Sequence, residues 1–359
     1  MGLQPVQQRG IDRYLFVESN EEGRFGYVDR TCRVVIPPRF EYADTFDGNL
    51  AYVREPGGAE GLIDTSGRLT VAVAQCPEGY MCNPGVEEIR QGVILFESVA
   101  LGAGYMEPGG KVAIQPDFHA ACRFSESLAW VAKEQFPGSA DWQWFCIDTT
   151  ARQRFPGFFR GVLPYAEGRA AVQAQTGGWF HIDSEGKPLS EERSDYAESF
   201  REGLAYVRSR SFHGYLDVSG RRAIKLPPEV EYARSFSNGM GCFTISAGGR
   251  ARTGYIDRTG QFAVEPLEGD GSDFSEGLAR FVRTADGGRQ VRDGFIDKVG
   301  RYVCELPPCT SVGLFQGGLC PVALKKGNQE EVVYVDRQGR VALRAPERCR
   351  FVVMFPGRD

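Results

Sequence analysis

The chain has 359 residues, of which 42% are hydrophobic and 12% aromatic, so it can bury a substantial core. Its formal net charge of −5 argues against a general nucleic-acid binder, which would need a basic face for the phosphates, and is compatible with a basic protein partner. The 45 glycines and 20 prolines occur without a low-complexity run, which indicates many turns and many short strands.

The sequence also indicates where the protein acts. No stretch is long and apolar enough to cross a membrane, and the first residues lack the apolar segment of a secretory signal, so we expect a cytoplasmic protein without membrane contact. The ten cysteines fit that compartment as reduced, buried thiols, although their even number would allow disulfides in an exported chain.

One four-residue phrase, glycine-aromatic-aliphatic-aspartate, recurs along the whole chain. Five copies keep both the glycine and the aspartate and begin at Gly26, Gly61, Gly214, Gly254 and Gly294. Four altered copies end at Glu107, Asp148, Asp183 and Asp336. The nine acidic residues that end the phrase are spaced by about 38 residues on average, a period typical of one small supersecondary unit repeated in tandem.

The sequence therefore predicts a single repeat array over residues 1–359, because tandem repeats grow as one continuous body. The nine repeats are expected around residues 12–46, 47–90, 91–124, 125–164, 165–200, 201–236, 237–274, 275–315 and 316–359.

Each repeat is predicted to be an antiparallel meander of three short strands. In the best preserved copy the first strand covers residues 204–207. The second is the phrase itself, residues 214–217, whose aromatic and aliphatic side chains suit a pleated surface. The third, residues 223–226, ends at Pro227, which lacks the N–H needed to continue a ladder.

The aspartate that ends the phrase opens a four-residue turn that closes with glycine. The turn aspartates are Asp64, Asp183, Asp217, Asp257, Asp297 and Asp336. An aspartate there accepts a hydrogen bond from the backbone two residues on, and the glycine adopts a positive φ. Calcium loops need several oxygen ligands at alternating positions, whereas each turn here offers one carboxylate, so we assign these residues a structural role.

A connector joins each repeat to the next, with an alanine and a phenylalanine at fixed positions. Examples are the segments 40–46, 118–124, 195–200 and 230–236. Their apolar residues lie three apart, which predicts a single helical turn across the edge of the sheet. The phenylalanine is expected to fill the gap between neighbouring repeats, since one repeat cannot bury its apolar face alone.

The phrase, the Asp-x-x-Gly turn and the Phe-x-x-Gly-Leu-Ala segment, which is exact at Phe274–Ala279, resemble the WG-repeat family of bacterial tandem repeats. The resemblance extends from about Tyr14 to about Phe355. The departure is the family's tryptophan before the glycine: only Trp144 and Trp179 occupy its position, and each precedes phenylalanine. The resemblance implies an all-β architecture and non-enzymatic binding. Repeats of this family look like interaction scaffolds, and many stand near secreted bacterial toxin systems, where some act as immunity proteins.

The predicted repeats can stack as an open, curved, solenoid-like body or close into a propeller-like ring. Nine repeats would make a wide ring, since propellers typically have about four to eight blades. The repeats also differ in length, which an arc tolerates more easily than a ring. We favour the open array.

No sequence fingerprint of a known catalytic class is present, so we predict no enzymatic activity, no cofactor and no metal. His119, His181 and His213 lie in three different repeats. The close pairs Cys76/Cys82 and Cys304/Cys309 have no second pair or histidine at zinc spacing.

The repeat is most altered between Ala74 and Arg160, and insertions in repeat arrays map to loops on one face, often the binding face. The altered segments carry acidic and aromatic side chains that suit an interface to a basic partner. The predicted partner-binding residues are Glu87, Glu88, Phe136, Asp141, Trp142, Phe158 and Phe159. Alternatively, the aromatic residues only fill gaps in a diverged core.

We expect a cytoplasmic immunity protein that occludes a cognate secreted toxin, such as a nuclease, whose basic surface would suit the negative charge. A general interaction scaffold or regulator without a toxin is the alternative. An enzyme is the third possibility. A carbohydrate-binding module is the fourth, and it requires exposed Tyr27, Tyr215 and Tyr255, which we expect to be packed.

Overall fold

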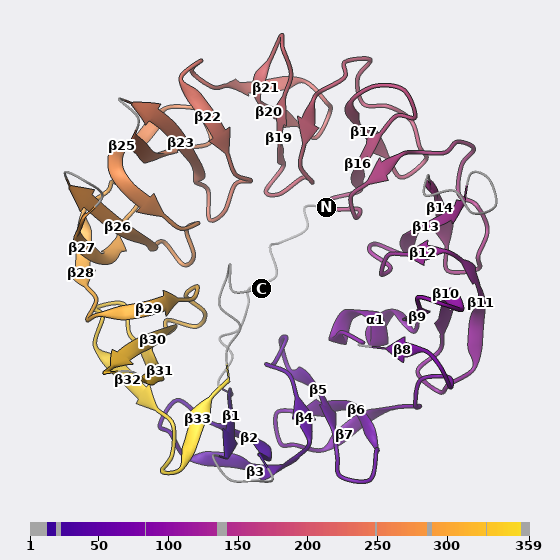
Figure 1. The fold of residues 1–359 in the computed structure, drawn as a ribbon, viewed down its shortest axis with the longest axis horizontal. Coiled ribbons are helices and arrows are strands. Elements are labelled where there is room, and N and C mark those ends of the chain that lie inside the picture. The colour runs from indigo at the N-terminus through magenta and orange to yellow at the C-terminus, as the bar shows by residue number, and fades with distance from the viewer. Residues whose placement is uncertain are drawn as a thin grey trace, which may run out of the picture. The chain divides into compact units, whose positions relative to one another are not determined.

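The computed structural model describes residues 13–18, 23–82, 84–134, 142–247, 250–285, 289–327 and 329–352. Short antiparallel strands dominate these residues, and one helix, α1 (Val86–Gln91), interrupts them (Figure 1). The predicted all-β repeat fold is thereby confirmed. The helix in these ranges is too short to span a bilayer.

The chain forms two compact units, here called the terminal unit (residues 1–75 with 274–359) and the middle unit (residues 76–273). Each contains several small sheets in which consecutive strands pair as antiparallel meanders.

The terminal unit contains a sheet that joins both ends of the chain. Its order is β3 (Val34–Phe40), β2 (Phe25–Val28), β1 (Tyr14–Glu18) and β33 (Cys349–Phe351). Phe16 of β1 lies opposite Gly26 on one side and Phe351 on the other. The last strand of the chain therefore completes the sheet of the first repeat, a pairing that the sequence did not predict.

The other strands of the terminal unit form three meanders. The first comprises β4 (Tyr42–Ala43), β5 (Leu50–Arg54), β6 (Glu60–Asp64) and β7 (Leu69–Val73). The second comprises β26 (Ala279–Ala285), β27 (Arg289–Ile296) and β28 (Tyr302–Glu305). The third comprises β29 (Cys309–Val312), β30 (Cys320–Lys326), β31 (Gln329–Val335) and β32 (Val341–Arg344).

The middle unit contains five meanders. The first two are β8 (Met81–Cys82), β9 (Ile94–Ser98), β10 (Gly102–Met106) and β11 (Val112–Phe118), then β12 (Ala120–Ala121), β13 (Leu128–Glu134) and β14 (Trp142–Asp148). The third is β15 (Gly161–Val162), β16 (Arg169–Gln173) and β17 (Trp179–Asp183). The last two are β18 (Tyr196–Ala197), β19 (Leu204–Arg208), β20 (His213–Asp217) and β21 (Arg222–Lys225), then β22 (Val230–Ala233), β23 (Gly241–Ala247), β24 (Arg250–Ile256) and β25 (Phe262–Gly271).

The connectors are extended, so the predicted helical turn is wrong. In β18, Tyr196 lies opposite Arg208 and Ala197 opposite Val207, which makes the connector an added strand at the edge of the meander. The same pairing recurs in β4 and β22. The physical reason is that tyrosine and alanine alternate between solvent and core, a period of two that only a strand satisfies.

The glycine of the recurring phrase allows a close backbone approach. A Cβ at Gly214 would lie 2.0 Å from the carbonyl oxygen of Ile224, and one at Gly294 would lie 2.1 Å from that of Cys304. The register shifts next to both positions, so the third strand bends across the second at a bulge.

Edge-on pairs of rings join five meanders to the meander that follows in the chain. The aromatic residue of the phrase contacts the connector phenylalanine of the following meander, with ring centroids 4.7–4.9 Å apart. The pairs are Tyr27–Phe46, Tyr105–Phe124, His181–Phe200, Tyr215–Phe236 and Phe295–Phe315. All ten rings are buried. In these five places the connector phenylalanine fills the space between neighbouring meanders, as the sequence predicted.

Where the aromatic residue of the recurring phrase is a tyrosine, its hydroxyl also donates a hydrogen bond to the connector backbone. The Tyr215 hydroxyl donates to the carbonyl oxygen of Arg234 at 2.7 Å, and Tyr27 and Tyr255 donate to Asp44 and Ser272 at 2.7 and 2.8 Å. Burial raises the pKa of these hydroxyls, which keeps them neutral donors. Because the rings are buried, they are inaccessible to a sugar, which excludes the carbohydrate-binding alternative built on them.

Glutamates in the tight turns after four connectors link neighbouring repeats. Glu202 adopts φ 54°, and its two oxygens accept from the backbone N–H groups of Asn238 and Gly239 in the next repeat at 2.6 and 2.8 Å. Glu126, Glu167 and Glu276 reach the next turn in the same way. Such charge-assisted bonds fix the spacing of the turns.

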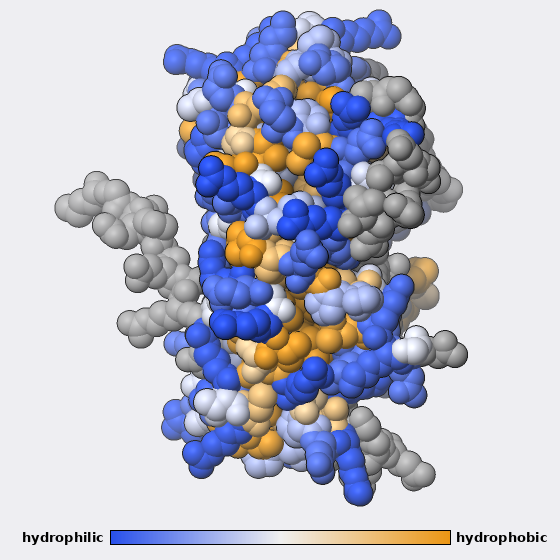
Figure 2. Space-filling model, turned by 90° about the vertical axis from the view of Figure 1, so that its left-hand side faces the viewer, coloured by the Kyte–Doolittle hydropathy of each residue, from blue (hydrophilic) through white to orange (hydrophobic). Residues whose placement is uncertain are grey.

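On the face of the terminal unit that includes β28 and β29, Figure 2 shows apolar residues between hydrophilic ones. Val299, Val303 and Leu314 are exposed in this part of the terminal unit. They are spread over a turn, an edge strand and a connector.

Replacing the connector phenylalanine Phe236 by alanine should lower the free energy of unfolding by about 3–5 kcal/mol, because the ring is fully buried between two repeats. The matched control is Phe262→Ala, whose ring is half exposed and should cost less than half as much. Urea denaturation measures both, and equal losses for the two variants would contradict the proposed role of Phe236.

Candidate protein-binding site

The structure places the predicted partner-binding residues in different environments. Phe136 and Asp141 lie outside the described residues. Glu87 is exposed on α1, where Gln91 donates to it. Glu88 is buried, which corrects its prediction as a surface residue. Its carboxylate caps α1 by accepting from the N–H of Gly85, and it forms a 3.3 Å ion pair with Arg123.

Phe159 is also buried, which corrects a second prediction. Its backbone pairs with Trp144, and its ring lies 5.7 Å from that of Trp130 inside the core. The segment after β14 thus forms isolated bridges with that strand, and Phe155 and Phe159 are buried.

Trp142 and Phe158 are exposed, but they do not form one patch. Trp142 packs against Trp144, whereas Phe158 packs against Phe145, with ring centroids 6.3 and 5.8 Å apart. Because Trp144 and Phe145 are consecutive residues of β14, they point to opposite faces of the sheet.

The altered segment after Ala74 is held by a disulfide between Cys76 and Cys82, with 5.7 Å between the Cα atoms. This corrects the expectation that all cysteines are reduced; the eight others in the chain are free thiols. The Tyr80 ring packs edge-on against Phe96 at 4.9 Å, and its hydroxyl donates to the carbonyl of Leu101.

This segment exposes apolar side chains that the sequence analysis missed. Met81 is 69% exposed, and Leu101, whose side chain lies against Gly79, is 53% exposed. Val99 is fully exposed in the adjoining turn. In the sequence, the methionine that lies between two closely spaced cysteines was the signal that could have indicated these exposed side chains. We call Met81, Val99 and Leu101 the apolar patch.

The turn aspartates are occupied within their own turns. Asp217 Oδ1 accepts from the N–H of Ser219 at 2.8 Å, from its hydroxyl at 2.6 Å, and from the N–H of Arg221 at 3.1 Å. The Ser219 hydroxyl is the main cause that holds the pKa of Asp217 below its usual value. Backbone bonds of the same kind recur at Asp64, Asp183, Asp257, Asp297 and Asp336.

The three histidines have separate partners. His181 is buried and its Nε2 lies 2.8 Å from the carbonyl oxygen of Glu198. His213 Nε2 lies 2.7 Å from the Tyr206 hydroxyl, and His119 lies 3.4 Å from Glu134. Within the described ranges, no three His, Cys, Asp or Glu side chains gather in a way that could hold a metal ion.

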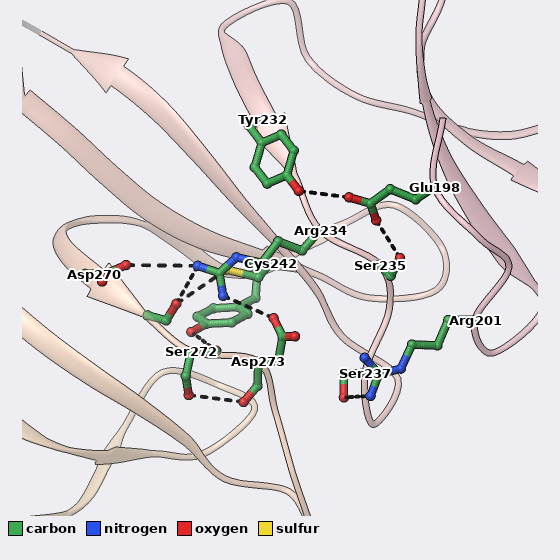
Figure 3. Close-up of polar contacts among 12 residues, drawn as sticks. Glu198, Arg201, Tyr232, Arg234, Ser235, Ser237, Cys242, Asp270, Ser272 and Asp273 are labelled. Atoms are coloured by element: carbon green, nitrogen blue, oxygen red, sulfur yellow. Dashed lines mark hydrogen bonds and ion pairs between the residues drawn. The ribbon is translucent and has the colours of Figure 1, made fainter. Parts of the chain in front are cut away.

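A polar cluster in the middle unit brings together residues from two successive connectors (Figure 3). Glu198 follows β18, and its Oε1 accepts from the hydroxyls of Tyr232 at 2.8 Å and Tyr196 at 3.1 Å. Its Oε2 accepts from the Ser235 hydroxyl at 2.5 Å. We call Tyr196, Glu198, Tyr232 and Ser235 the tyrosine–carboxylate cluster.

The next connector carries a cation at the position equivalent to Glu198. Arg234 forms a 3.1 Å ion pair with Asp273, lies 4.0 Å from Asp270, and donates to the carbonyl of Gly271 at 2.9 Å (Figure 3). Burial and the charge of Arg234 act oppositely on the nearby Cys242, and burial prevails, raising the pKa of its thiol to about 12.

The sequence analysis did not single out these connector residues. The signal was present, because the residue after the connector alanine changes from Asp44 to Glu198 to Arg234, while the tyrosine and alanine before it stay the same.

The meanders, the shared aromatic core and the exposed side chains of the connectors and altered loops define an all-β repeat protein with surfaces suited to binding. The model of the WG containing repeat matches residues 25–57, 104–135, 179–210 and 254–283. The chain therefore carries WG-containing repeats at these four places, as the resemblance implied.

Among solved structures, the chain resembles one described as the crystal structure of the eukaryotic initiation factor, with a TM-score of 0.55, 11% identity and 96% of each chain covered. Hsv2 of Kluyvelomyces marxianus gives a TM-score of 0.34 at 9% identity, covering 59% of this chain and 69% of that chain. The first likeness shows the fold alone. No curated protein sequence matches the chain.

His181 should make the stability of the protein depend on pH. Burial lowers the pKa of this histidine, so the unfolded chain binds its proton first as the pH falls below about 6.5, and the folded state loses stability. In His181→Tyr, the tyrosine should donate to the Glu198 carbonyl as Tyr215 donates to Arg234.

The difference in free energy of unfolding between His181→Tyr and the wild type should therefore widen between pH 7.5 and pH 5. His213 is common to both proteins, so its titration cancels in the difference. Urea denaturation at each pH measures it, and a constant difference would show that His181 is not held neutral by the fold.

Proposed function

We propose that this chain is a non-enzymatic protein-binding repeat protein, and specifically an immunity protein that binds and occludes a cognate secreted bacterial toxin. The observation that carries the proposal is the apolar patch. Its side chains are exposed on a segment where the repeat is most altered, whereas residues that maintain the repeat are buried.

The apolar patch has the properties of a docking surface. The Tyr80 ring packs on Phe96 and its hydroxyl donates to the carbonyl of Leu101, which holds the loop in place, so little conformational entropy is lost when a partner binds. Methionine and leucine adapt to an apolar surface, and the adjoining helix carries the exposed Glu87, which forms a 3.8 Å ion pair with Arg90. A partner with an apolar contact surrounded by basic residues fits this arrangement.

A nuclease toxin has such a basic surface, because it must bind phosphates. The net charge of −5 would attract that surface and speed association. Inhibition would follow from occlusion: the bound repeat protein covers the toxin's cleft, so no chemistry is required of this chain.

The cytoplasm is the proposed place of action, and the free thiols agree with it. The Cys76–Cys82 disulfide favours an oxidising compartment, since disulfides are rare in the cytosol. Alkylation of cell extracts followed by mass spectrometry separates the two, because a cytoplasmic protein should yield alkylated Cys76.

Co-expression with the product of the neighbouring open reading frame should give a complex in size-exclusion chromatography. The double variant Met81→Asp/Leu101→Asp should weaken binding by at least about 100-fold, because it places charge in an apolar contact. The matched control Val218→Asp, in an exposed turn of another repeat, should bind normally.

Loss of toxin inhibition in the double variant alone would support an immunity function. A complex that leaves the toxin active would favour the general scaffold, and the absence of any complex would overturn the proposal.

A further inference from the structure

The Glu198 carboxylate is hydrogen-bonded but not neutralised. Three hydroxyls donate to it, from Tyr196, Tyr232 and Ser235. Across the described residues, no lysine, arginine or histidine lies within ion-pair distance of it. Hydroxyl donors orient a carboxylate but leave its charge in place, so the cluster still attracts a cation.

The two tyrosine rings are positioned to receive that cation. Tyr196 is 38% and Tyr232 40% exposed, and their ring centroids are 6.3 Å apart at an interplanar angle of 68°. The buried Tyr206 ring packs beneath both, at 5.9 and 5.7 Å, and holds them in place. Aromatic faces attract cations within about 6 Å of the ring centre.

A related arrangement in the terminal unit shows what such a cluster accepts. Tyr42 donates to Asp44 at 2.7 Å, as Tyr196 does to Glu198, and Tyr52 packs on Tyr42 as Tyr206 packs on Tyr196. There the guanidinium of Arg54 lies over the Tyr42 ring, 5.9 Å from its centroid. The chain's own arginine thus serves as a model of the ligand.

The equivalent arginine in the middle unit is used elsewhere. Arg208 lies opposite Tyr196 exactly as Arg54 lies opposite Tyr42 in the strand register. Its Nη1 instead donates to the carbonyl oxygen of Glu231 at 3.0 Å. The longer glutamate also recruits Tyr232 from the next connector, so two exposed rings surround the acceptor oxygen where Asp44 has one tyrosine.

We propose that Tyr196, Glu198 and Tyr232 form a binding site for a cationic side chain, an arginine or lysine of a protein partner. The carboxylate supplies the charge, the rings supply two faces, and Ser235 fixes the carboxylate. The assignment of the cation to a protein rests on the proposed function; the site itself does not.

The test uses the full chain labelled with 3-fluorotyrosine, observed by fluorine NMR, with Tyr196 and Tyr232 assigned through the variants Tyr196→Phe and Tyr232→Phe. Titration with Nα-acetyl-arginine amide should shift these two signals, with millimolar affinity that falls as salt rises. Nα-acetyl-citrulline amide, which has the same shape without the charge, should shift neither signal.

Glu198→Gln should weaken arginine binding at least tenfold, because the amide keeps the hydrogen-bonding size but loses the charge. The matched control Asp44→Asn alters the equivalent position in the terminal unit and should leave the binding unchanged. The other fluorotyrosine signals report whether each variant remains folded.

Equal shifts with citrulline, or unchanged binding in folded Glu198→Gln, would overturn the site. A positive titration together with no protein complex would leave the cation site standing and reject only the toxin partner.

Discussion

The edge-on contact between the aromatic residue of one meander and the connector phenylalanine of the next is the interaction on which the rest of the structure depends. A single meander has two apolar faces and too little chain to cover them. The ring pair, 4.9 Å apart for Tyr215 and Phe236, closes the space between two meanders, and the Tyr215 hydroxyl bonds to the backbone that leads into that phenylalanine. Ring packing and a hydrogen bond therefore hold the same two meanders together.

The contact between meanders uses some residues to build the array and leaves others free to vary. The hydrogen bond from the tyrosine or histidine of the recurring phrase goes to a backbone carbonyl of the connector. It therefore does not restrict which side chain the connector residue carries. The residues held in this way are Asp44, Cys122, Glu198, Arg234 and Ser272. A scaffold that presents different chemistry at one equivalent position of each repeat is suited to recognition.

Sequence reasoning succeeded where structure is set by neighbouring residues. Strands and Asp-x-x-Gly turns follow from side-chain period and from hydrogen bonds that span a few residues. The connectors were mispredicted because their apolar spacing of three suggested a helix, whereas the alternation of Tyr196 and Ala197 between solvent and core decides for a strand.

Features that join distant parts of the chain were beyond the sequence pattern. The pairing of β1 with β33 and the burial of Phe159 depend on which segments meet in space. For the candidate site, the region was chosen by its irregularity, yet Glu88 serves a helix cap there, and the tyrosine–carboxylate cluster lies in regular connectors. The apolar patch lies where the sequence departs from the repeat, whereas the tyrosine–carboxylate cluster lies at regular positions of the repeat.

A double-mutant cycle between Tyr215 and Phe236 tests the central claim most directly. Tyr215→Leu, Phe236→Leu and the double variant are compared by the free energy of unfolding. If the ring pair joins the repeats, the two substitutions should be coupled by about 0.5–1.5 kcal/mol, the range measured for edge-on aromatic pairs. Losses that add within about 0.3 kcal/mol would show that the two rings stabilise their own repeats independently, and would contradict the account.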